Sequence, residues 1–198
     1  MLPPPFLGND LLRGEWVALA RPTSADYPVI ASWSSDIEYM RMLRRGLVYP
    51  GSAEGFGNWL EGMMQNESGF PFAIRGREDG GLLGFVLIHD IFWQARHGSV
   101  VIGIDPAQRG HGYGTDALRV LLKYAFLEMN FNRVGLEVMS YNAAGIRAYT
   151  KVGFVQEGRL RAFVYRDGVY YDILTMSILR PEWEALYLKS PASAAAPE

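Results

Sequence analysis

The chain has 198 residues, 49% of them hydrophobic, and its 19 basic and 21 acidic side chains give a formal charge of −2. This length fits one ordinary domain with a sizeable core, and the lack of cysteine excludes disulfides, thiolate nucleophiles and cysteine-ligated zinc. The near-neutral charge, without a long basic block, argues against nucleic acid or an anionic membrane as the main partner.

The first half of the chain predicts one strand and a group of helices. Residues 1–10 lack a basic run before their apolar part, and no apolar run approaches the roughly 20 residues that span a bilayer. We therefore expect a soluble, cytoplasmic protein. Residues 14–22 read as a first strand, and residues 24–68 read as two or three helices with a break at LVYPGS.

Three strands are predicted next. The apolar segments 70–76, 81–93 and 99–105 are separated by the turns REDGG and QARHG. Consecutive strands joined by short turns pair antiparallel, so this part of the chain predicts an antiparallel meander.

The second half alternates helices and strands. A helix is predicted over 115–129, because its apolar residues fall on one helical face: Leu118, Leu121, Leu122, Ala125 and Met129. A strand over 133–142, a short helix over 143–152 and a strand pair over 154–179 follow. The strand pair turns at Asp167-Gly168, a dipeptide that favours tight hairpins.

This order of elements predicts the fold class, an α/β (α+β) domain with a single sheet. The strand-helix-strand unit over 99–139 requires a parallel crossover among otherwise antiparallel neighbours. No internal repeat or low-complexity linker divides the chain, so we expect one domain over 1–189. The small, polar tail over 190–198 is expected to be disordered.

Three glycines stand at alternate positions between a predicted strand and the predicted helix, in PAQRGHGYGT (106–115). A glycine lowers helix propensity by about 1 kcal/mol relative to alanine, so Gly110, Gly112 and Gly114 indicate a need for bare backbone. The free N–H groups and dipole of a helix start favour phosphate oxygens. The segment therefore predicts a phosphate-binding loop.

Two common phosphate motifs do not match this loop. A P-loop requires a Gly-Lys pair, which the chain lacks. A dinucleotide-binding fingerprint requires a third glycine at position 115, which is threonine, and the preceding strands do not open a βαβ series. The pattern R-x-x-G-x-G, formed by Arg109, Gly112 and Gly114, does match.

With this loop, the chain resembles the GNAT family of N-acetyltransferases, in particular its branch of ribosomal-protein N-terminal and spermidine-type enzymes. The resemblance covers roughly residues 10–187 and rests on three motifs: IGIDPAQRGHGYGTDAL, LEVMSYNAAGIRAYTKVGFVQEGRLR, and DGVYYDILTMSIL followed by EW. The second motif departs from the branch pattern at Gly145 and Ile146. The resemblance implies a mixed, mostly antiparallel GNAT sheet with a splayed parallel central pair and helices on both faces.

The resemblance also implies acetyl-CoA as cosubstrate and no metal. The main chain of 102–104 would pair with the pantetheine amides, and the backbone of 109–115 would wrap the pyrophosphate. Large side chains in place of the three glycines would push the pyrophosphate away from this backbone. The implied cofactor-binding residues are Ile102, Gly103, Ile104, Arg109, Gly110, His111, Gly112, Tyr113, Gly114, Thr115, Asn142 and Tyr149. Three scattered histidines offer no metal cluster: His89, His97 and His111.

Acetyl transfer to an amine needs a neutral amine, donors for the carbonyl oxygen, a proton for the departing thiolate, and proximity. Without cysteine or a recognisable serine nucleophile, direct transfer in a ternary complex is favoured. The resemblance implies a backbone N–H donor at a strand bulge around Gly103, Tyr149 as the acid, and Asn142 against the cofactor or a water. The alternative is that Tyr149 is a half-buried helix aromatic and Asn142 an N-cap or turn residue.

No general base is assigned from the sequence. Many relatives carry a glutamate on the strand before the loop, and HGSVVIGID has none. Three open candidates would act through water, namely Asp90, His97 and Asp172; a mechanism without a dedicated base is also open. Glu137 reads as structural, and Arg44-Arg45 as a solvated helix end.

Five aromatic residues are predicted to belong to the core, with one or two of them able to touch the acceptor: Trp33, Tyr39, Trp59, Phe92 and Trp93.

The leading functional hypothesis is an N-acetyltransferase acting on a primary amine of a protein N-terminus, polyamine, amino acid or antibiotic. A non-catalytic acyl-CoA-binding module is the alternative, motivated by the missing glutamate and opposed by the presence of Asn142 and Tyr149. A nicotinamide oxidoreductase is a third reading, which predicts NAD binding in preference to CoA. The expected partner is a small-molecule or peptide amine, with no nucleic acid and no membrane. The oligomeric state is left open, and a homodimer is suggested by the resemblance alone.

Overall fold

A seven-stranded sheet forms the centre of the part of the chain that this computed structural model describes, residues 10–65 and 68–188. The spatial order of its strands is β1-β2-β3-β4-β5-β7-β6, and every neighbouring pair is antiparallel except β4 and β5. The strands are β1 (Val17–Ala20), β2 (Gly69–Gly76), β3 (Leu82–Phe92), β4 (His97–Ile104), β5 (Arg133–Met139), β6 (Val155–Arg166) and β7 (Val169–Leu179).

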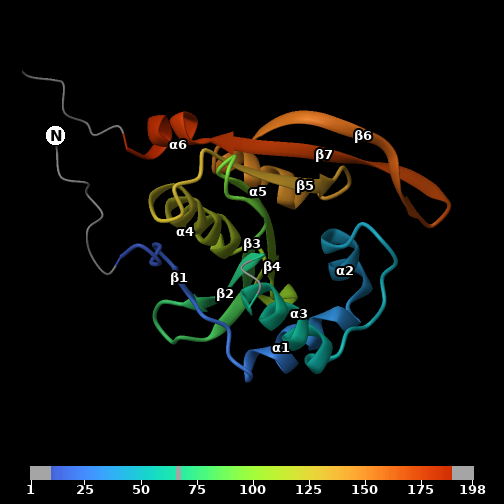
Figure 1. Cartoon of the computed structure of the whole chain (residues 1–198). Coiled ribbons are helices and arrows are strands. Elements are labelled where there is room, and N and C mark those ends of the chain that lie inside the picture. Colours follow the sequence, from blue (N-terminus) through green and yellow to red (C-terminus); the bar gives the residue numbers. More distant parts are fainter. Residues whose placement is uncertain (1–9, 66–67, 189–198) are drawn as a thin grey trace, which may run out of the picture.

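The helices cover both faces of this sheet (Figure 1). They are α1 (Asp26–Ser32), α2 (Ile37–Leu43), α3 (Ala53–Gln65), α4 (Tyr113–Leu127), α5 (Ala143–Lys151) and α6 (Arg180–Tyr187). Helices α1 to α3 gather on one side of β3 and β4, and α4 lies on the other. The described part of the chain contains no helix that is long and apolar enough to cross a membrane.

The sequence predicted most of these elements correctly. The mixed sheet, the β2-β3-β4 meander, the parallel crossover through α4 and the final hairpin are confirmed. At the hairpin turn, Asp167 and Gly168 both have positive φ, 48° and 83°, as such turns require. The predicted disorder of 190–198 and the absence of a targeting signal in 1–9 concern residues outside the described ranges.

Helix α6 was missing from the predicted elements. It begins at Arg180, has a proline in its first turn, and Glu182 accepts a hydrogen bond from the N–H of Leu179 at 2.8 Å. Proline near a helix start and an acidic side chain that bonds back to the cap are both recognised start signals. These signals were available in the sequence.

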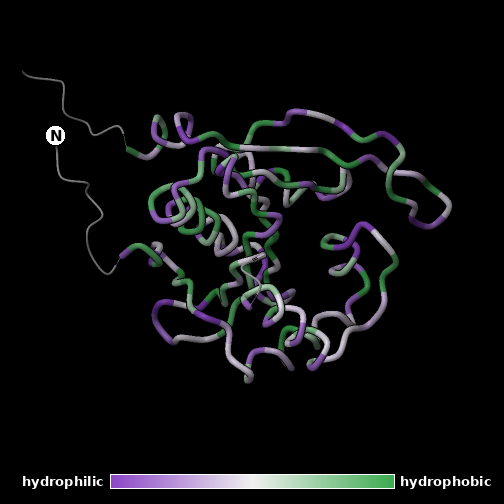
Figure 2. The backbone as a smooth tube through the Cα atoms, viewed as in Figure 1, coloured by the Kyte–Doolittle hydropathy of each residue, from purple (hydrophilic) through white to green (hydrophobic). Residues whose placement is uncertain are grey.

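Helix α4 packs on the sheet through the apolar face that its sequence predicts. Leu118, Leu121, Leu122 and Ala125 are all buried, and hydrophobic and hydrophilic residues alternate around the helix (Figure 2). The carboxylate of Asp116, in its first turn, accepts hydrogen bonds from the backbone N–H groups of three residues that lead into β1: Glu15, Trp16 and Val17. These bonds fix the start of α4, and with it the glycine loop, against the sheet.

The prediction that five aromatic residues lie in the core is correct for only two of them. Trp33 and Tyr39 are buried in the cluster under α1 to α3. Trp59 is on the outer side of α3, and Phe92 and Trp93 lie where β3 turns towards β4, so these three are 46%, 62% and 49% exposed. Aromatic character alone does not distinguish a core position from the end of a hairpin.

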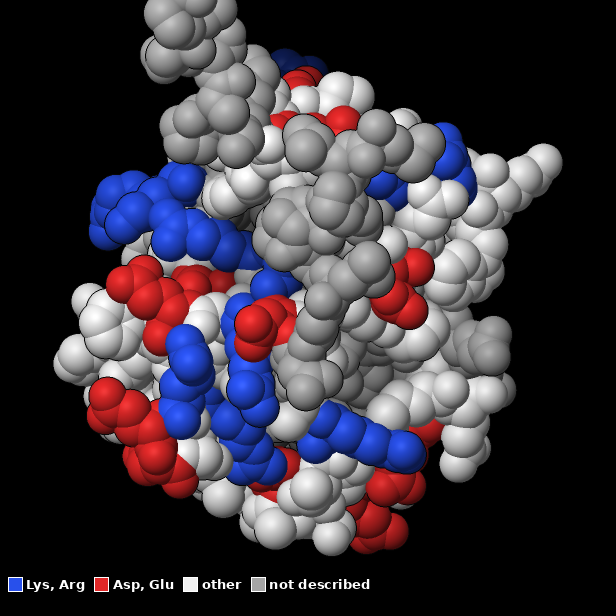
Figure 3. Space-filling model, turned by 90° about the vertical axis from the view of Figure 1, so that its left-hand side faces the viewer, with Lys and Arg blue, Asp and Glu red and all other residues white. Residues whose placement is uncertain are grey.

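The hairpin β6-β7 reaches past the sheet to the region of α2 (Figure 1). At its tip, the carboxylate of Asp167 accepts two hydrogen bonds from the Arg41 guanidinium, at 2.7 and 2.9 Å. Arg166 donates to the backbone carbonyls of Arg44 and Gly46 at 2.7 and 3.2 Å. On the face shown in Figure 3, basic and acidic side chains are interspersed, in keeping with the near-neutral charge.

Candidate active site

A cleft of about 730 Å³ opens between α2, the end of β4, the glycine loop and α5. This volume lies within the range of ordinary ligand sites. The lining includes ten of the twelve predicted cofactor-binding residues: Ile102, Gly103, Ile104, Arg109, Gly110, Gly112, Gly114, Thr115, Asn142 and Tyr149. The structure therefore brings together residues that are separated by up to 47 positions in the sequence, from Ile102 to Tyr149.

One wall of the cleft is the open edge of β4. The parallel strands β4 and β5 pair only where His97–Ser99 face Arg133–Gly135, and beyond that point the two strands separate. The N–H of Asp105 donates to Leu83 on β3 at 2.9 Å. Because main-chain groups alternate in direction along a strand, those of Ile102 and Ile104 point away from β3, into the gap. They can pair with the amides of an extended ligand.

The bulge predicted at Gly103 is absent. The β3-β4 register is continuous from Gly84 opposite Ile104 to His89 opposite Ser99, and its irregularity lies further on, between His89 and Phe92. With a regular ladder, the main-chain N–H of Gly103 points to β3. The donors on the open edge are consequently those of Ile102 and Ile104.

The three loop glycines meet two different needs. Gly110 and Gly112 have φ of 85° and 87°, a left-handed conformation that L side chains rarely adopt, and no heavy atom lies within 4 Å of where their Cβ atoms would be. Gly114 has an ordinary φ, but a Cβ there would lie 3.3 Å from Cγ1 of Ile104. The first two glycines shape the loop, and the third lets α4 approach β4.

The loop ends at a helix start with free backbone donors. Gly112 is the N-cap of α4 and has no side chain that could accept a hydrogen bond from the first turn. The N–H groups at this end of the helix, beside the cleft, are therefore available to a ligand. Together with the helix dipole, such a start binds anionic oxygens. Arg109, Arg147 and Lys151 add positive charge to the same lining.

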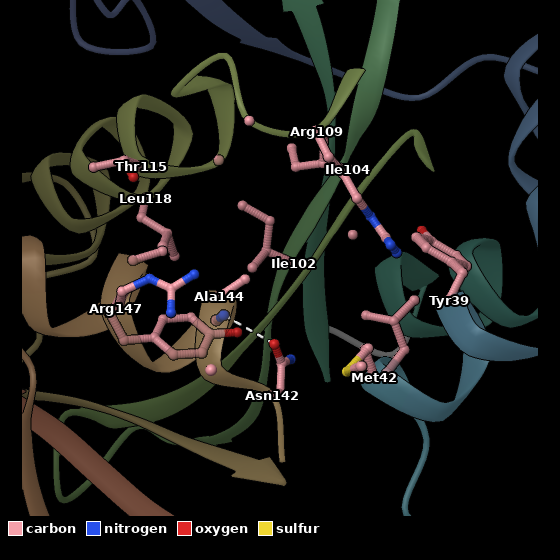
Figure 4. A pocket seen from close by; sticks show the side chains of 18 of the residues that line it. Tyr39, Met42, Ile102, Ile104, Arg109, Thr115, Leu118, Asn142, Ala144 and Arg147 are labelled. Carbon is pink, nitrogen blue, oxygen red and sulfur yellow. Dashed lines mark hydrogen bonds between the residues drawn. The ribbon is translucent and has the colours of Figure 1, made fainter. Parts of the chain in front are cut away.

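The side chain of Arg109 crosses the cleft instead of following the loop. Figure 4 shows it extending towards Tyr39 on α2, and its guanidinium carbon lies 5.1 Å from the centre of the Tyr39 ring. His111 and Tyr113 stack on each other with ring centres 5.7 Å apart, and neither belongs to the cleft lining. Of the loop residues predicted to bind cofactor, these two are the ones that the structure leaves outside.

Asn142 caps α5 and also lines the cleft. Its Oδ1 accepts a hydrogen bond from the N–H of Gly145 at 2.9 Å, the dashed line in Figure 4. A Cβ on Gly145 would lie 2.8 Å from Nδ2 of Asn142, so a larger residue there would require the Asn142 side chain to shift. The N-cap alternative for Asn142 is therefore correct, and its free Nδ2 side remains at the cleft.

Tyr149 lines the cleft from α5 and is only 8% exposed. Its ring packs edge-on against Phe154, with ring centres 5.9 Å apart. Burial raises the pKa of its hydroxyl to about 12, because the phenolate would lose its hydration. Tyr149 therefore keeps its proton at neutral pH and presents a neutral donor.

The open candidates for a general base lie away from the cleft. Asp90 contacts His89 at 3.0 Å, His97 stacks on Phe92, and Asp172 accepts from Arg159 at 2.7 Å. None of them belongs to the lining. The Arg44-Arg45 pair is more than a solvated end, since Arg45 forms an ion pair with Glu137 at 2.5 Å. Glu137 does not belong to the cleft lining, and its structural role stays a prediction.

Glu38 was not predicted as a site residue, and Tyr39 was predicted to lie in the core as one of five aromatics of which one or two could touch the acceptor. Both line the cleft from α2, together with Met42 and Leu43. The pairs 38/42 and 39/43 are four apart and so share one side of a helix, which is the signal that was present in the sequence. Among the described lining residues, Glu38 is the only carboxylate. Within the described ranges, no group of three or more His, Asp or Glu side chains could hold a metal ion.

This geometry suits a long ligand that carries amides at one end and phosphate at the other. The open edge of β4 offers main-chain partners to the amides, and the start of α4 offers N–H groups to the phosphate. Tyr149 and Glu38 stand beside this path, where one can donate a proton and the other can accept one.

Comparisons with known proteins agree with this arrangement. Residues 17–155 match the model of the acetyltransferase (GNAT) domain. An uncharacterized prophage-derived N-acetyltransferase of Bacillus subtilis, YokL, is 28% identical over 76% of this chain and 84% of the relative. The putative ribosomal N-acetyltransferase YdaF of the same organism is 26% identical, and the match covers 90% of this chain and 84% of YdaF.

The fold also matches a solved structure. The spermidine N-acetyltransferase of Vibrio cholerae, crystallised with CoA and spermine, superposes with a TM-score of 0.77. It is 22% identical, and the match covers 85% of this chain and 98% of that one. At this identity the likeness establishes the shared fold.

Proposed function

The chain belongs to the GNAT acetyltransferase family and is an acetyl-CoA-dependent N-acetyltransferase, and we propose that it passes the acetyl group directly to a primary amine in a ternary complex. The observation that carries this proposal is the meeting, in one cleft, of the open edge of β4, the uncapped start of α4 and Tyr149. Among the residues that the structure describes, none that lines the cleft is a serine, and the chain has no cysteine, so no covalent intermediate on such a nucleophile is invoked.

In this proposal the cofactor follows the walls of the cleft. The pantetheine amides pair with the main chain of Ile102 and Ile104, and the diphosphate lies on the N–H groups between Arg109 and Thr115. The thioester then lies near α2 and α5, where Glu38 and Tyr149 line the cleft. Holding both reactants in this way removes most of the entropy cost of their encounter.

The chemical step needs one proton removed and one supplied. The amine nitrogen bonds to the carbonyl carbon and the C–S bond breaks, while the amine proton passes to Glu38 or water. Tyr149 gives its proton to the departing thiolate. Its raised pKa does not oppose this role, because a thiolate in the same buried place is destabilised by the same loss of hydration.

The charges around the cleft mouth favour an amino-acid or peptide amine as the acceptor. The described lining carries Arg109, Arg147 and Lys151 against one carboxylate, Glu38. Beyond the lining, Arg41 and Arg45 are neutralised by ion pairs with Asp167 and Glu137. Some relatives are named spermidine N-acetyltransferases. A polyamine would bring several positive charges to this basic lining, whereas a peptide brings carbonyls that arginine can bind.

The test is a panel of acceptors with free CoA as the readout. The panel contains a short peptide with a free N-terminus, the same peptide with an acetylated N-terminus, and spermidine. We expect acceptor-dependent release of CoA with the free peptide and none with its blocked twin. Tight binding of acetyl-CoA without release for any amine would instead establish a non-catalytic binding module, and faster release with spermidine would overturn the acceptor assignment.

A further inference from the structure

The hydroxyl group of Tyr39 has no use in the architecture of the fold. The side chain is 2% exposed, and its Oη has no hydrogen-bond partner among residues 10–65 and 68–188. A buried polar group without a partner destabilises a protein, because it has lost its hydration without compensation. Phenylalanine would fill the same space without that cost. We therefore infer that the hydroxyl binds a ligand.

The position of this hydroxyl is firmly set. Asp36 caps α2 by accepting from the N–H of Tyr39 at 3.0 Å, which fixes the backbone of the residue. The ring packs edge-on against Trp33, with ring centres 6.2 Å apart, and the Arg109 guanidinium lies on the ring from the cleft side. A side chain held from these directions cannot easily turn its hydroxyl elsewhere.

The hydroxyl lies against the strand that lines the cleft. Its Oη occupies the space where a Cβ on Gly103 would stand, and Gly103 is flanked by Ile102 and Ile104, whose main chain faces the gap. Tyr39 and Gly103 both line the cleft. The hydroxyl therefore projects from α2 towards the segment of β4 that is proposed to bind the pantetheine arm, and the thioester is proposed to lie near the same helix.

The electrostatics favour a partner that gains negative charge. Burial raises the pKa of Tyr39 well above its ordinary value, so the hydroxyl stays neutral and can donate. The neighbouring Arg109 cation opposes part of this increase, and it also repels an ammonium group while attracting an oxyanion. Two of the reacting groups gain negative charge, the acetyl carbonyl oxygen and the departing sulfur. Because Tyr149 is assigned to the sulfur, the carbonyl oxygen is the partner left for Tyr39.

We propose that Tyr39 Oη donates a hydrogen bond to the acetyl carbonyl oxygen and stabilises the negative charge that develops there. The inference rests on the proposed acetyl transfer. The C–N bond forms and the C–S bond breaks as described above, and Tyr39 keeps its proton throughout. Its task is distinct from that of Tyr149, which gives its proton to sulfur.

The test is the substitution Tyr39→Phe, with Tyr124→Phe as the matched control. Tyr124 is a partly buried tyrosine on α4 that packs against Phe72 and does not line the cleft. For Tyr39→Phe we expect kcat to fall about 100-fold, as on loss of one oxyanion donor, with both KM values within about twofold of wild type. The melting temperature should stay equal or rise, because no bond within the protein is lost. The control should leave kcat unchanged.

A second measurement tests the contact without turnover. The infrared stretch of the carbonyl in 13C-labelled acetyl-CoA should lie at lower frequency when bound to wild type than when bound to Tyr39→Phe. An unchanged kcat, an unchanged stretch, or an effect confined to the acceptor KM would overturn the proposal. If wild type released no CoA with any amine, the proposed function would fail, and the infrared shift would still decide the role of Tyr39.

Discussion

The hydroxyl oxygen of Tyr39 lies where the side chain of residue 103 would begin, so Gly103 and Tyr39 share one space on the wall of the cleft. A Cβ on Gly103 would also come within 2.7 Å of Cε1 of Phe85. Tyr39 and Phe85 are both buried and cannot simply swing away. The identity of residue 103 is thus fixed by an aromatic side chain that lies 64 positions earlier in the sequence.

The first prediction concerns this shared space. Gly103→Ala should lower the free energy of unfolding by about 1 to 3 kcal/mol, because overpacking forces buried side chains to shift. It should also reduce turnover, since Tyr39 and β4 both move. Gly135→Ala on the neighbouring strand is the control, because its Cβ would meet nothing nearer than 3.8 Å. Denaturant melts of both variants provide the measurement, and equal stability of the two would contradict the account.

The second prediction concerns the glycine loop. Gly112→Ala should weaken CoA binding at least tenfold, because a side chain at positive φ distorts the N-cap from which the amides of α4 are presented. Gly80→Ala is the matched control, since Gly80 also has a positive φ of 69° and open space but lies in the β2-β3 turn. Both variants should lose about 1 kcal/mol of stability, and only the first should lose affinity. A similar loss of affinity in both would attribute the effect to general strain.

The third prediction tests Tyr149 as the acid. Tyr149→Phe should lower kcat by about 100-fold or more, with nearly unchanged affinity for acetyl-CoA, because the thiolate then leaves without a proton. Since burial raises the pKa of Tyr149 to about 12, wild type should keep its kcat between about pH 8 and about pH 10. Tyr165→Phe, on the exposed side of β6, is the control. Full turnover in Tyr149→Phe would remove this residue from the mechanism.

The fourth prediction is about acid stability, away from the cleft. Arg133 donates two hydrogen bonds to Glu157, and this pairing lowers the pKa of Glu157 from 4.5 to about 2. A lowered pKa stabilises the fold above pH 4.5, and the contribution is lost as the pH falls towards 2. The side chains are partly exposed, so the contribution is at most about 1 kcal/mol.

Thermal melts of Glu157→Gln at several pH values check this prediction. The variant should melt below wild type at neutral pH, and the difference should vanish as the pH approaches 2. Glu78→Gln, in the exposed turn between β2 and β3, should match wild type throughout. A difference that persists at the lowest pH would show that the ion pair is not its cause.

The sequence predicted the fold well because most elements carry local signals. The period of α4, the alternation of turns and strands in β2-β3-β4, and Asp167-Gly168 each act within a few residues. The glycine loop was recognised for the same reason. The different roles of its glycines were not predicted, because glycine is needed at 114 only where α4 packs against Ile104 of β4.

The acceptor side could not be predicted in the same way. Tyr39 reaches Gly103, Arg109 reaches Tyr39, and Arg41 reaches Asp167 only through tertiary structure. Sequence periodicity could place Glu38 and Tyr39 on one side of a helix, but not say that this side meets β4. The missing bulge at Gly103 is a similar case, since register depends on the partner strand.

The most direct test of the account is a calorimetric titration of wild type and Gly112→Ala with CoA and with pantetheine, which shares the amide arm and lacks both the diphosphate and the 3′-phosphoadenosine. If the backbone between Arg109 and Thr115 holds the diphosphate, wild type should bind CoA at least 100-fold more tightly than pantetheine, and Gly112→Ala should lose affinity for CoA but not for pantetheine. Equal affinity for the two molecules, or no binding of CoA, would contradict the assignment of the glycine loop.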